Sequence, residues 1–130
     1  MSELRLNVIT NDWVIISKER SCRPHDFRRK VEKPRPSSFE ASCPFCPGNE
    51  ENTTKEKFRI DSRDGKGWRT RVVPNRYPAL FPGTRRAQST HEGLRHSVEG
   101  LGVHDVIVDC PAHDKTIALL DLDDVSSLML

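Results

Sequence analysis

Alternating apolar and polar residues near the start of the chain predict a β-hairpin. In residues 4–8 (LRLNV) every second side chain is apolar, which is the period of a strand with one buried face. Asn11-Asp12 is a turn signal, and residues 13–17 (WVIIS) are rich in β-branched side chains. These two runs are therefore expected to pair.

Three further runs predict strands later in the chain. Residues 57–60 (KFRI) and 68–73 (WRTRVV) are separated by the turn-forming cluster DSRDGKG at 61–67. The clearest strand is HDVIVDC at 104–110, in which Val106, Ile107 and Val108 are expected to be buried.

The remaining segments predict loops and one helix. Residues 18–42 carry many charges and prolines, and residues 81–97 show no apolar period, so both are expected to be irregular. Asp121 is a candidate helix cap. After it, one helix face would carry Leu122, Val125, Leu128 and Met129. The helix has no C-terminal stop signal, so we expect that residue 130 is not a natural domain end.

Composition favours one domain over residues 1–130, with a lean core. The chain has 130 residues, 35% of them apolar and 31% charged, and it has no apolar run of the ~18 residues that a membrane helix needs. Without a signal-peptide pattern, the cytoplasm is the expected location. The net charge of +2 favours no class of partner. The basic segment 18–35 is suited to bind phosphate or nucleic acid, and the alternative is a solvated loop.

The stretch SCPFCPGNE contains the pair Cys43 and Cys46, which can be a redox dithiol, half of a zinc site or a chance occurrence. A redox pair is expected at a helix N-terminus after a strand, and Pro44 and Pro47 disfavour a helix there. Zinc needs ligands from elsewhere. Spacing cannot choose among the candidates, although His113 is slightly favoured because it follows a rigid turn after a strand. These candidates are Cys22, His25, His91, His96, His104, Cys110 and His113.

Four segments in register resemble one enzyme family. NDWVIISKERSCRPHDF, CPFCPGNE, VVPNRYPAL and GVHDVIVDCPAHDKT are similar to the N-terminal portion of galactose-1-phosphate uridylyltransferase and its relative ADP-glucose phosphorylase, in the histidine-triad superfamily. The resemblance covers about residues 5–124. It implies an α+β fold: one histidine-triad-like half, with an antiparallel sheet, a packed helix, long irregular loops and a zinc knuckle.

The resemblance also implies a two-step reaction through a covalent nucleotidyl-histidine. In the family, that histidine lies in a His-Pro-His motif, whereas this sequence contains no His-x-His. We therefore assign no catalytic residue, and we expect no transferase turnover if these residues are the entire molecule. The expected enzyme is a UDP-glucose–hexose-1-phosphate uridylyltransferase, and the alternative within the family is ADP-glucose phosphorylase.

The implied site residues form two groups. Cys43, Cys46 and His113 match zinc ligands whose fourth partner is the first histidine of the missing motif, and a closed four-ligand site of this kind is structural. The second group would bind the nucleotide sugar. Arg20 and Arg23 match phosphate-binding arginines, while Asn75 and Arg76 match positions near the nucleoside.

A function from another class stays open at this point. A zinc knuckle could bind nucleic acid through the basic segment, with Trp13, Phe27 and Phe45 as stacking groups. An aromatic content of 6% and a net charge of +2 argue against it. We therefore expect a nucleotide sugar and a hexose 1-phosphate as partners, neither nucleic acid nor membrane, and a homodimer for the full-length protein.

Overall fold

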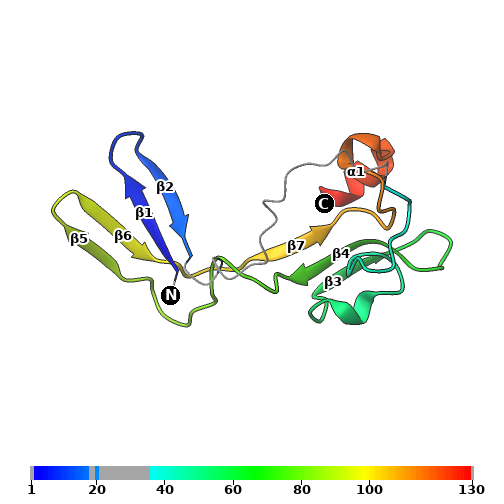
Figure 1. Ribbon diagram of the computed structural model, residues 1–130, viewed down its shortest axis with the longest axis horizontal. Coiled ribbons are helices and arrows are strands. Elements are labelled where there is room, and N and C mark those ends of the chain that lie inside the picture. The colour runs from blue at the N-terminus through cyan, green and yellow to red at the C-terminus, as the bar shows by residue number, and fades with distance from the viewer. Residues whose placement is uncertain (1, 18–19, 21–35, 130) are drawn as a thin grey trace. The chain divides into compact units, whose positions relative to one another are not determined.

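The computed structural model describes residues 2–17, 20 and 36–129, which fall into two compact units (Figure 1). The first unit comprises Met1–Phe27 and Tyr77–His104, and the second comprises Arg28–Arg76 and Asp105–Leu130. Each unit contains one antiparallel sheet. Both units are discontinuous in sequence, because the chain passes from the first unit to the second, returns to the first, and then completes the second.

The sheet of the first unit contains the expected N-terminal hairpin. Strands β1 (Glu3–Asn7) and β2 (Asp12–Ile16) pair antiparallel, which confirms that prediction. The turn contains Asn11 at φ 60°, a backbone region that asparagine enters more readily than most residues. The strand order is β2-β1-β6-β5, so β1 is an inner strand.

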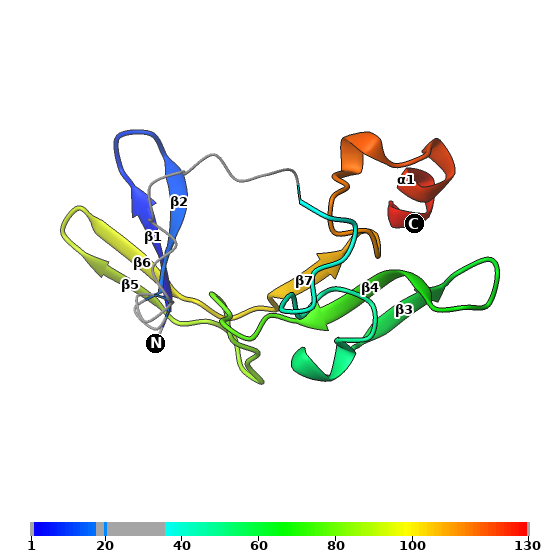
Figure 2. The same ribbon diagram turned by 45° about the vertical axis from the view of Figure 1, so that its right-hand side comes forward.

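The other half of this sheet corrects the prediction of a loop over residues 81–97. Ser89–Glu92 forms β5 and Arg95–Glu99 forms β6, and the two pair as a hairpin (Figure 2). The two-residue connection begins with Gly93 at φ +58°, the position where a type II′ turn requires glycine. The strands were missed because their residues are mostly polar, and a pattern search detects buried faces.

The second unit is built on a three-stranded sheet of order β3-β4-β7. The strands are β3 (Phe58–Asp61), β4 (Trp68–Pro74) and β7 (Asp105–Val108), each close to a predicted run. Val108 is buried, but Ile107 is 59% exposed. The prediction of a continuous buried run was therefore wrong, because successive side chains of this strand point to opposite faces.

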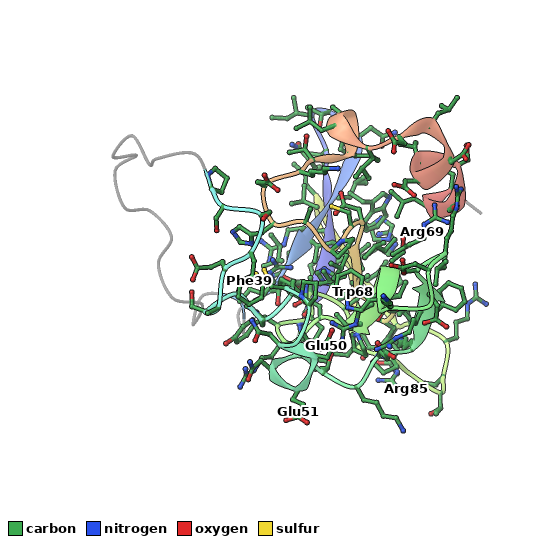
Figure 3. All side chains as sticks on the ribbon, turned by 90° about the vertical axis from the view of Figure 1, so that its right-hand side faces the viewer. Phe39, Glu50, Glu51, Trp68, Arg69 and Arg85 are labelled. Carbon is green, nitrogen blue, oxygen red and sulfur yellow. The ribbon has the colours of Figure 1, made fainter. Side chains whose placement is uncertain are left out.

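The central strand of this sheet buries polar as well as apolar side chains. Trp68 and Val73 are buried, and so is Arg71, at 1% exposure. The Arg71 guanidinium donates to Glu56 Oε2 at 2.9 Å and to Thr53 Oγ1 at 3.1 Å. Trp68 Nε1 donates to Glu50 Oε1 at 2.8 Å (both labelled in Figure 3). These bonds fix the segment before β3 against β4.

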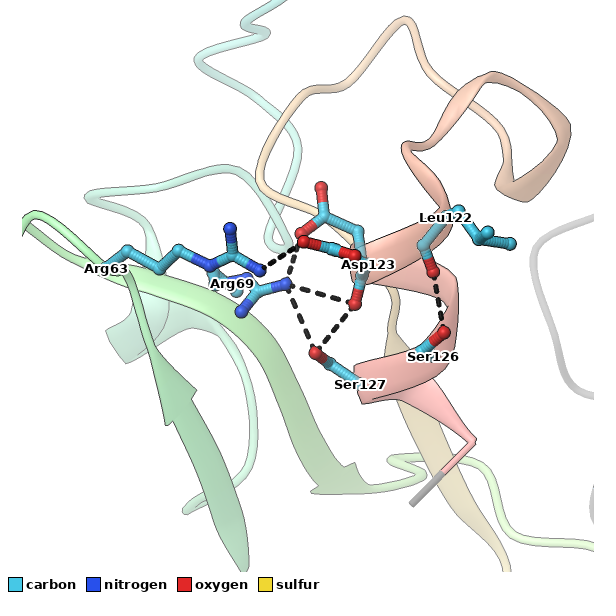
Figure 4. Close-up of polar contacts among 7 residues, drawn as sticks. Arg63, Arg69, Leu122, Asp123, Ser126 and Ser127 are labelled. Carbon is cyan, nitrogen blue, oxygen red and sulfur yellow. Dashed lines mark hydrogen bonds and ion pairs between the residues drawn. The ribbon is translucent and has the colours of Figure 1, made fainter.

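Helix α1 (Leu122–Leu128) is held to β4 by polar contacts. Arg69 reaches the Asp124 carboxylate, and it donates to Ser127 Oγ at 3.2 Å (Figure 4). The expected apolar face is not buried within the described residues, since Leu122 is 81% and Met129 is 75% exposed. Asp121 occupies the N-cap without a side-chain cap bond. In the described part of the chain, no helix is long and apolar enough to cross a membrane.

Candidate metal centre

The Cys-x-x-Cys segment folds as consecutive turns. The amide of Cys43 donates to Glu40 O at 3.1 Å, and the amide of Cys46 donates to Cys43 O at 3.3 Å. Asn49 closes the loop, because its Nδ2 donates to Ala41 O at 3.0 Å and to Cys43 O at 2.7 Å. Gly48 has φ +89°, which glycine adopts at low cost. The sequence thus forms a loop that presents both thiols without a helix.

His113 joins this loop from a distant part of the chain. It follows β7 after the Cys110-Pro111 corner, and its amide donates to Ser38 O at 2.9 Å, which ties its backbone to the segment before the cysteines. His113 Nδ1 lies 3.4 Å from Cys46 Sγ. One ligand atom each from Cys43, Cys46 and His113 all lie within 4.8 Å of one another.

This geometry fits a tetrahedral zinc ion. Bond lengths of ~2.3 Å to sulfur and ~2.0 Å to nitrogen place two ligands of one zinc about 3.5 Å apart, and the observed Cys46–His113 separation is 3.4 Å. Two thiolates and one imidazole are ligands of the kinds that zinc prefers, and a closed structural site needs a fourth. These three residues would hold the metal, which would then crosslink the Cys loop to the turn after β7.

Burial controls the protonation of the inner thiol. Cys46 is 2% exposed, and its removal from water raises the pKa of its thiol. The Glu40 amide, which donates to Sγ at 3.4 Å, acts in the opposite direction. Hydrogen bonds from the Ser42 amide and hydroxyl lower the pKa of the Glu40 carboxyl. A bound zinc ion would override the burial effect, since metal ligation deprotonates a thiol.

A third cysteine lines the same groove without joining the ligand group. The groove has a volume of about 280 Å³, and Phe45 and Cys110 are among its lining residues. Cys110 Sγ instead donates to Ala112 O at 3.3 Å, and burial raises the pKa of the thiol. Cys110 is therefore a natural control for the metal ligands.

The proposed phosphate-binding residues fall partly in the first unit. Arg20 lines a cavity of about 510 Å³ together with Ile15, Leu80 and His104. His104 Nδ1 accepts a hydrogen bond from the Ala79 amide at 2.8 Å, a contact that the sequence did not predict. Arg23 lies outside the described residues.

Asn75 and Arg76 belong to the second unit. They follow β4 directly; Asn75 is half-buried and Arg76 is exposed. Val73, two residues before Asn75, is 2% exposed in the core of this unit.

Comparison with known proteins places these features in one family. The sequence matches the family described as galactose-1-phosphate uridyl transferase, N-terminal domain, over residues 1–129. The chain belongs to this family. This membership confirms the resemblance inferred from the four sequence segments.

Relatives of this uridyl transferase family member include enzymes with two different names. An ADP-glucose phosphorylase of Arabidopsis thaliana is 40% identical over 124 residues, 95% of this chain and 34% of the relative. A galactose-1-phosphate uridylyltransferase of Haemophilus influenzae is 29% identical over 117 residues, 89% of this chain and 32% of the relative. The chain thus spans about a third of the length of these relatives.

Two solved structures of the family share the fold. The crystal structure of an ADP-glucose phosphorylase from Arabidopsis thaliana with bound ADP-glucose is 32% identical, with a TM-score of 0.51 over 99% of this chain and 35% of that chain. A uridylyltransferase structure is 26% identical, with a TM-score of 0.55 over 98% of this chain and 31% of that chain. Antiparallel sheets with one described helix are therefore the shared architecture, whereas the zinc knuckle remains a prediction.

Proposed function

We propose that this chain is the N-terminal part of an enzyme that transfers a nucleotidyl group from a nucleotide sugar to a phosphate-bearing acceptor. The observation that carries the proposal is the family match over residues 1–129. The sequence contains no His-x-His, so in this proposal another part of the enzyme supplies the residue that attacks phosphorus, and this part contributes binding and architecture.

The choice of donor rests on the relatives. The sequence alone favoured UDP-glucose with a hexose 1-phosphate acceptor. The 40% identity to an ADP-glucose phosphorylase supports ADP-glucose with a phosphate acceptor instead. UDP-glucose remains the second candidate, because the family and several of its relatives are uridylyltransferases.

In this proposal, the site residues bind and orient the donor. Arg20 and Arg23 would contact the phosphates, since a guanidinium fork meets two oxygens at once. Asn75 and Arg76 would lie near the nucleoside. Zinc held by Cys43, Cys46 and His113 would stabilise the second unit, and it would take no part in the transfer once a fourth ligand from the rest of the enzyme closes the site.

A binding experiment separates these alternatives. The chain is titrated with ADP-glucose, UDP-glucose and a random oligonucleotide, and binding is followed by calorimetry and thermal shift. We expect ADP-glucose to bind more tightly than UDP-glucose, and Arg20→Ala to weaken both. Arg85→Ala is the matched control, because Arg85 is an exposed arginine of the same unit that pairs with Glu99 at 2.7 Å. Salt-sensitive binding to the oligonucleotide alone would instead support a nucleic-acid-binding module.

A further inference from the structure

Two histidines of the first unit face each other across the β5–β6 hairpin. His91 on β5 is the direct partner of His96 on β6. The pair that flanks the two-residue loop is Glu92 and Arg95. In such a hairpin the flanking pair is hydrogen-bonded, so the next pair, His91 and His96, is a non-hydrogen-bonded pair. Side chains of a non-hydrogen-bonded pair approach each other most closely. The backbone therefore holds two imidazoles side by side at the surface.

The side chains reflect this proximity. The two imidazole rings stack with their centroids 3.7 Å apart and their planes at 26°. His91 is exposed and His96 is half-buried. Ser89 Oγ lies 3.1 Å from His96 Nε2, and Trp13 of β2 meets the His96 ring edge-on at 4.9 Å. A hydrogen bond to one ring nitrogen fixes the tautomer of a histidine and orients the other nitrogen toward a ligand.

We propose that His91 and His96 form a second metal site, a two-histidine chelate for divalent ions of the nickel and copper type. Imidazole is a ligand that these ions prefer, and their affinity for a given nitrogen site exceeds that of most other divalent first-row metals. This site is independent of the nucleotide-sugar proposal and of the Cys43–Cys46–His113 group, which lies in the other unit.

Metal binding replaces ring stacking by ligation. The lone pairs of stacked imidazoles run nearly parallel, so the rings turn about their second side-chain torsion, which is broad for histidine, until two nitrogens converge on one ion. Exposure of His91 gives its ring room to turn. Because the pair supplies two protein ligands, water or a small anion completes the coordination shell.

Nickel titration tests the proposal on the whole chain, preloaded with one equivalent of zinc to fill the Cys43–Cys46–His113 group. Nickel chloride is added and binding is measured by calorimetry, together with tryptophan fluorescence, which an ion beside Trp13 quenches. Nickel on thiolates would show separately as charge-transfer absorption. We expect one nickel ion to bind with quenching, and Trp13→Phe to abolish most of the quenching while leaving the heat of binding.

Variants decide whether the two histidines act as one chelate. His91→Asn and His96→Asn should each weaken nickel binding about tenfold or more, because each removes the gain from linking two ligands, and the double variant should lose little further. Thr90→Ala, on the same strand and the opposite face, is the control and should bind like the original chain. The proposal would be overturned if either single variant bound nickel with wild-type affinity, or if the two single losses were equal and added in the double variant. Loss of nickel binding only in Cys46→Ser would also overturn it.

Discussion

Cys46 is the residue on which the candidate metal centre depends most. It is nearly inaccessible to solvent, its sulfur lies 3.4 Å from His113 Nδ1, and the Glu40 amide donates to it at the same distance. The Cys46 thiol therefore already contacts a ring nitrogen and a backbone amide, and a metal ion would be a further partner. Substitution of Cys46 should therefore weaken metal binding more than substitution of any neighbouring residue.

Cys46→Ser should weaken zinc binding by about tenfold or more, because a serine hydroxyl replaces a soft thiolate in the ligand set. The measurement is zinc stoichiometry and affinity by competition with a chromogenic chelator. Cys110→Ser, in the same groove with its thiol turned to Ala112 O, should keep the affinity. Equal losses in both variants would contradict the three-residue centre.

Glu56 is the main charge partner of the buried Arg71. Hydrogen bonds from the Arg71 and then the Arg59 guanidinium lower the pKa of Glu56 from its ordinary value of 4.5. A carboxyl whose pKa is lower in the folded state stabilises the fold when ionised. This contribution is present at neutral pH and is lost as the pH falls through the lowered pKa.

Glu56→Gln should therefore lower the free energy of unfolding at pH 7 by about 1–3 kcal/mol, because it leaves the Arg71 charge without its carboxylate. The difference from the original chain should shrink as the pH falls below 4.5, where the wild-type carboxyl protonates too. Urea unfolding at several pH values measures it. Glu51, which is labelled in Figure 3, is exposed. Glu51→Gln should therefore change the free energy of unfolding little at any pH.

At the scale of elements, helix α1 shows how a short helix is held without a buried apolar face. It has seven residues, too few to be stable alone in water. Two arginines reach it from the second sheet's hairpin. The Arg69 side chain is 18% exposed and contacts several groups, whereas Arg63 pairs with Asp123 with both side chains mostly exposed, at 67% and 73%.

Arg69→Ala should release α1, while Arg63→Ala should leave it in place, because exposed ion pairs contribute at most about 1 kcal/mol. Hydrogen exchange at the α1 amides measures the effect: we expect faster exchange in Arg69→Ala and near-original rates in Arg63→Ala. Equal acceleration in the two variants would show that net charge, and not the buried contact, holds the helix.

The elements also show how far the sequence alone could predict this fold. Strands with a buried side, such as β4 and β7, could be found because burial selects alternating or β-branched residues. The β5–β6 hairpin could not, because its stability comes from Gly93 and from pairing with the distant β1. The metal ligands are similar. The Cys pair is visible locally, but His113 stands 67 positions from Cys46, so the residues alone favoured it only slightly and the resemblance was needed to single it out.

At the scale of the molecule, the proposed roles of this chain are binding and structural, and its sequence contains no His-x-His. We predict that incubation with radiolabelled UDP-glucose or ADP-glucose leaves no acid-labile, base-stable label on this chain, because the nucleotidyl-histidine of the family reaction has no counterpart here. Recovery of such a label would contradict the assignment of the nucleophile to another part of the enzyme. Noncovalent binding measured in parallel shows that the donor was recognised.

The discontinuity of both units has a consequence for biosynthesis. Glu3 of β1 pairs with Glu99 of β6, and β4 of the second unit pairs with β7 at Asp105–Val108. At roughly 5–20 residues per second, the N-terminal hairpin leaves the ribosome roughly 5–20 s before the partner of its inner strand is made. During that interval Trp13 and Ile15 have no completed sheet around them. The two sheets close almost together, when the residues around 95–108 emerge, so neither unit completes its sheet much before the other.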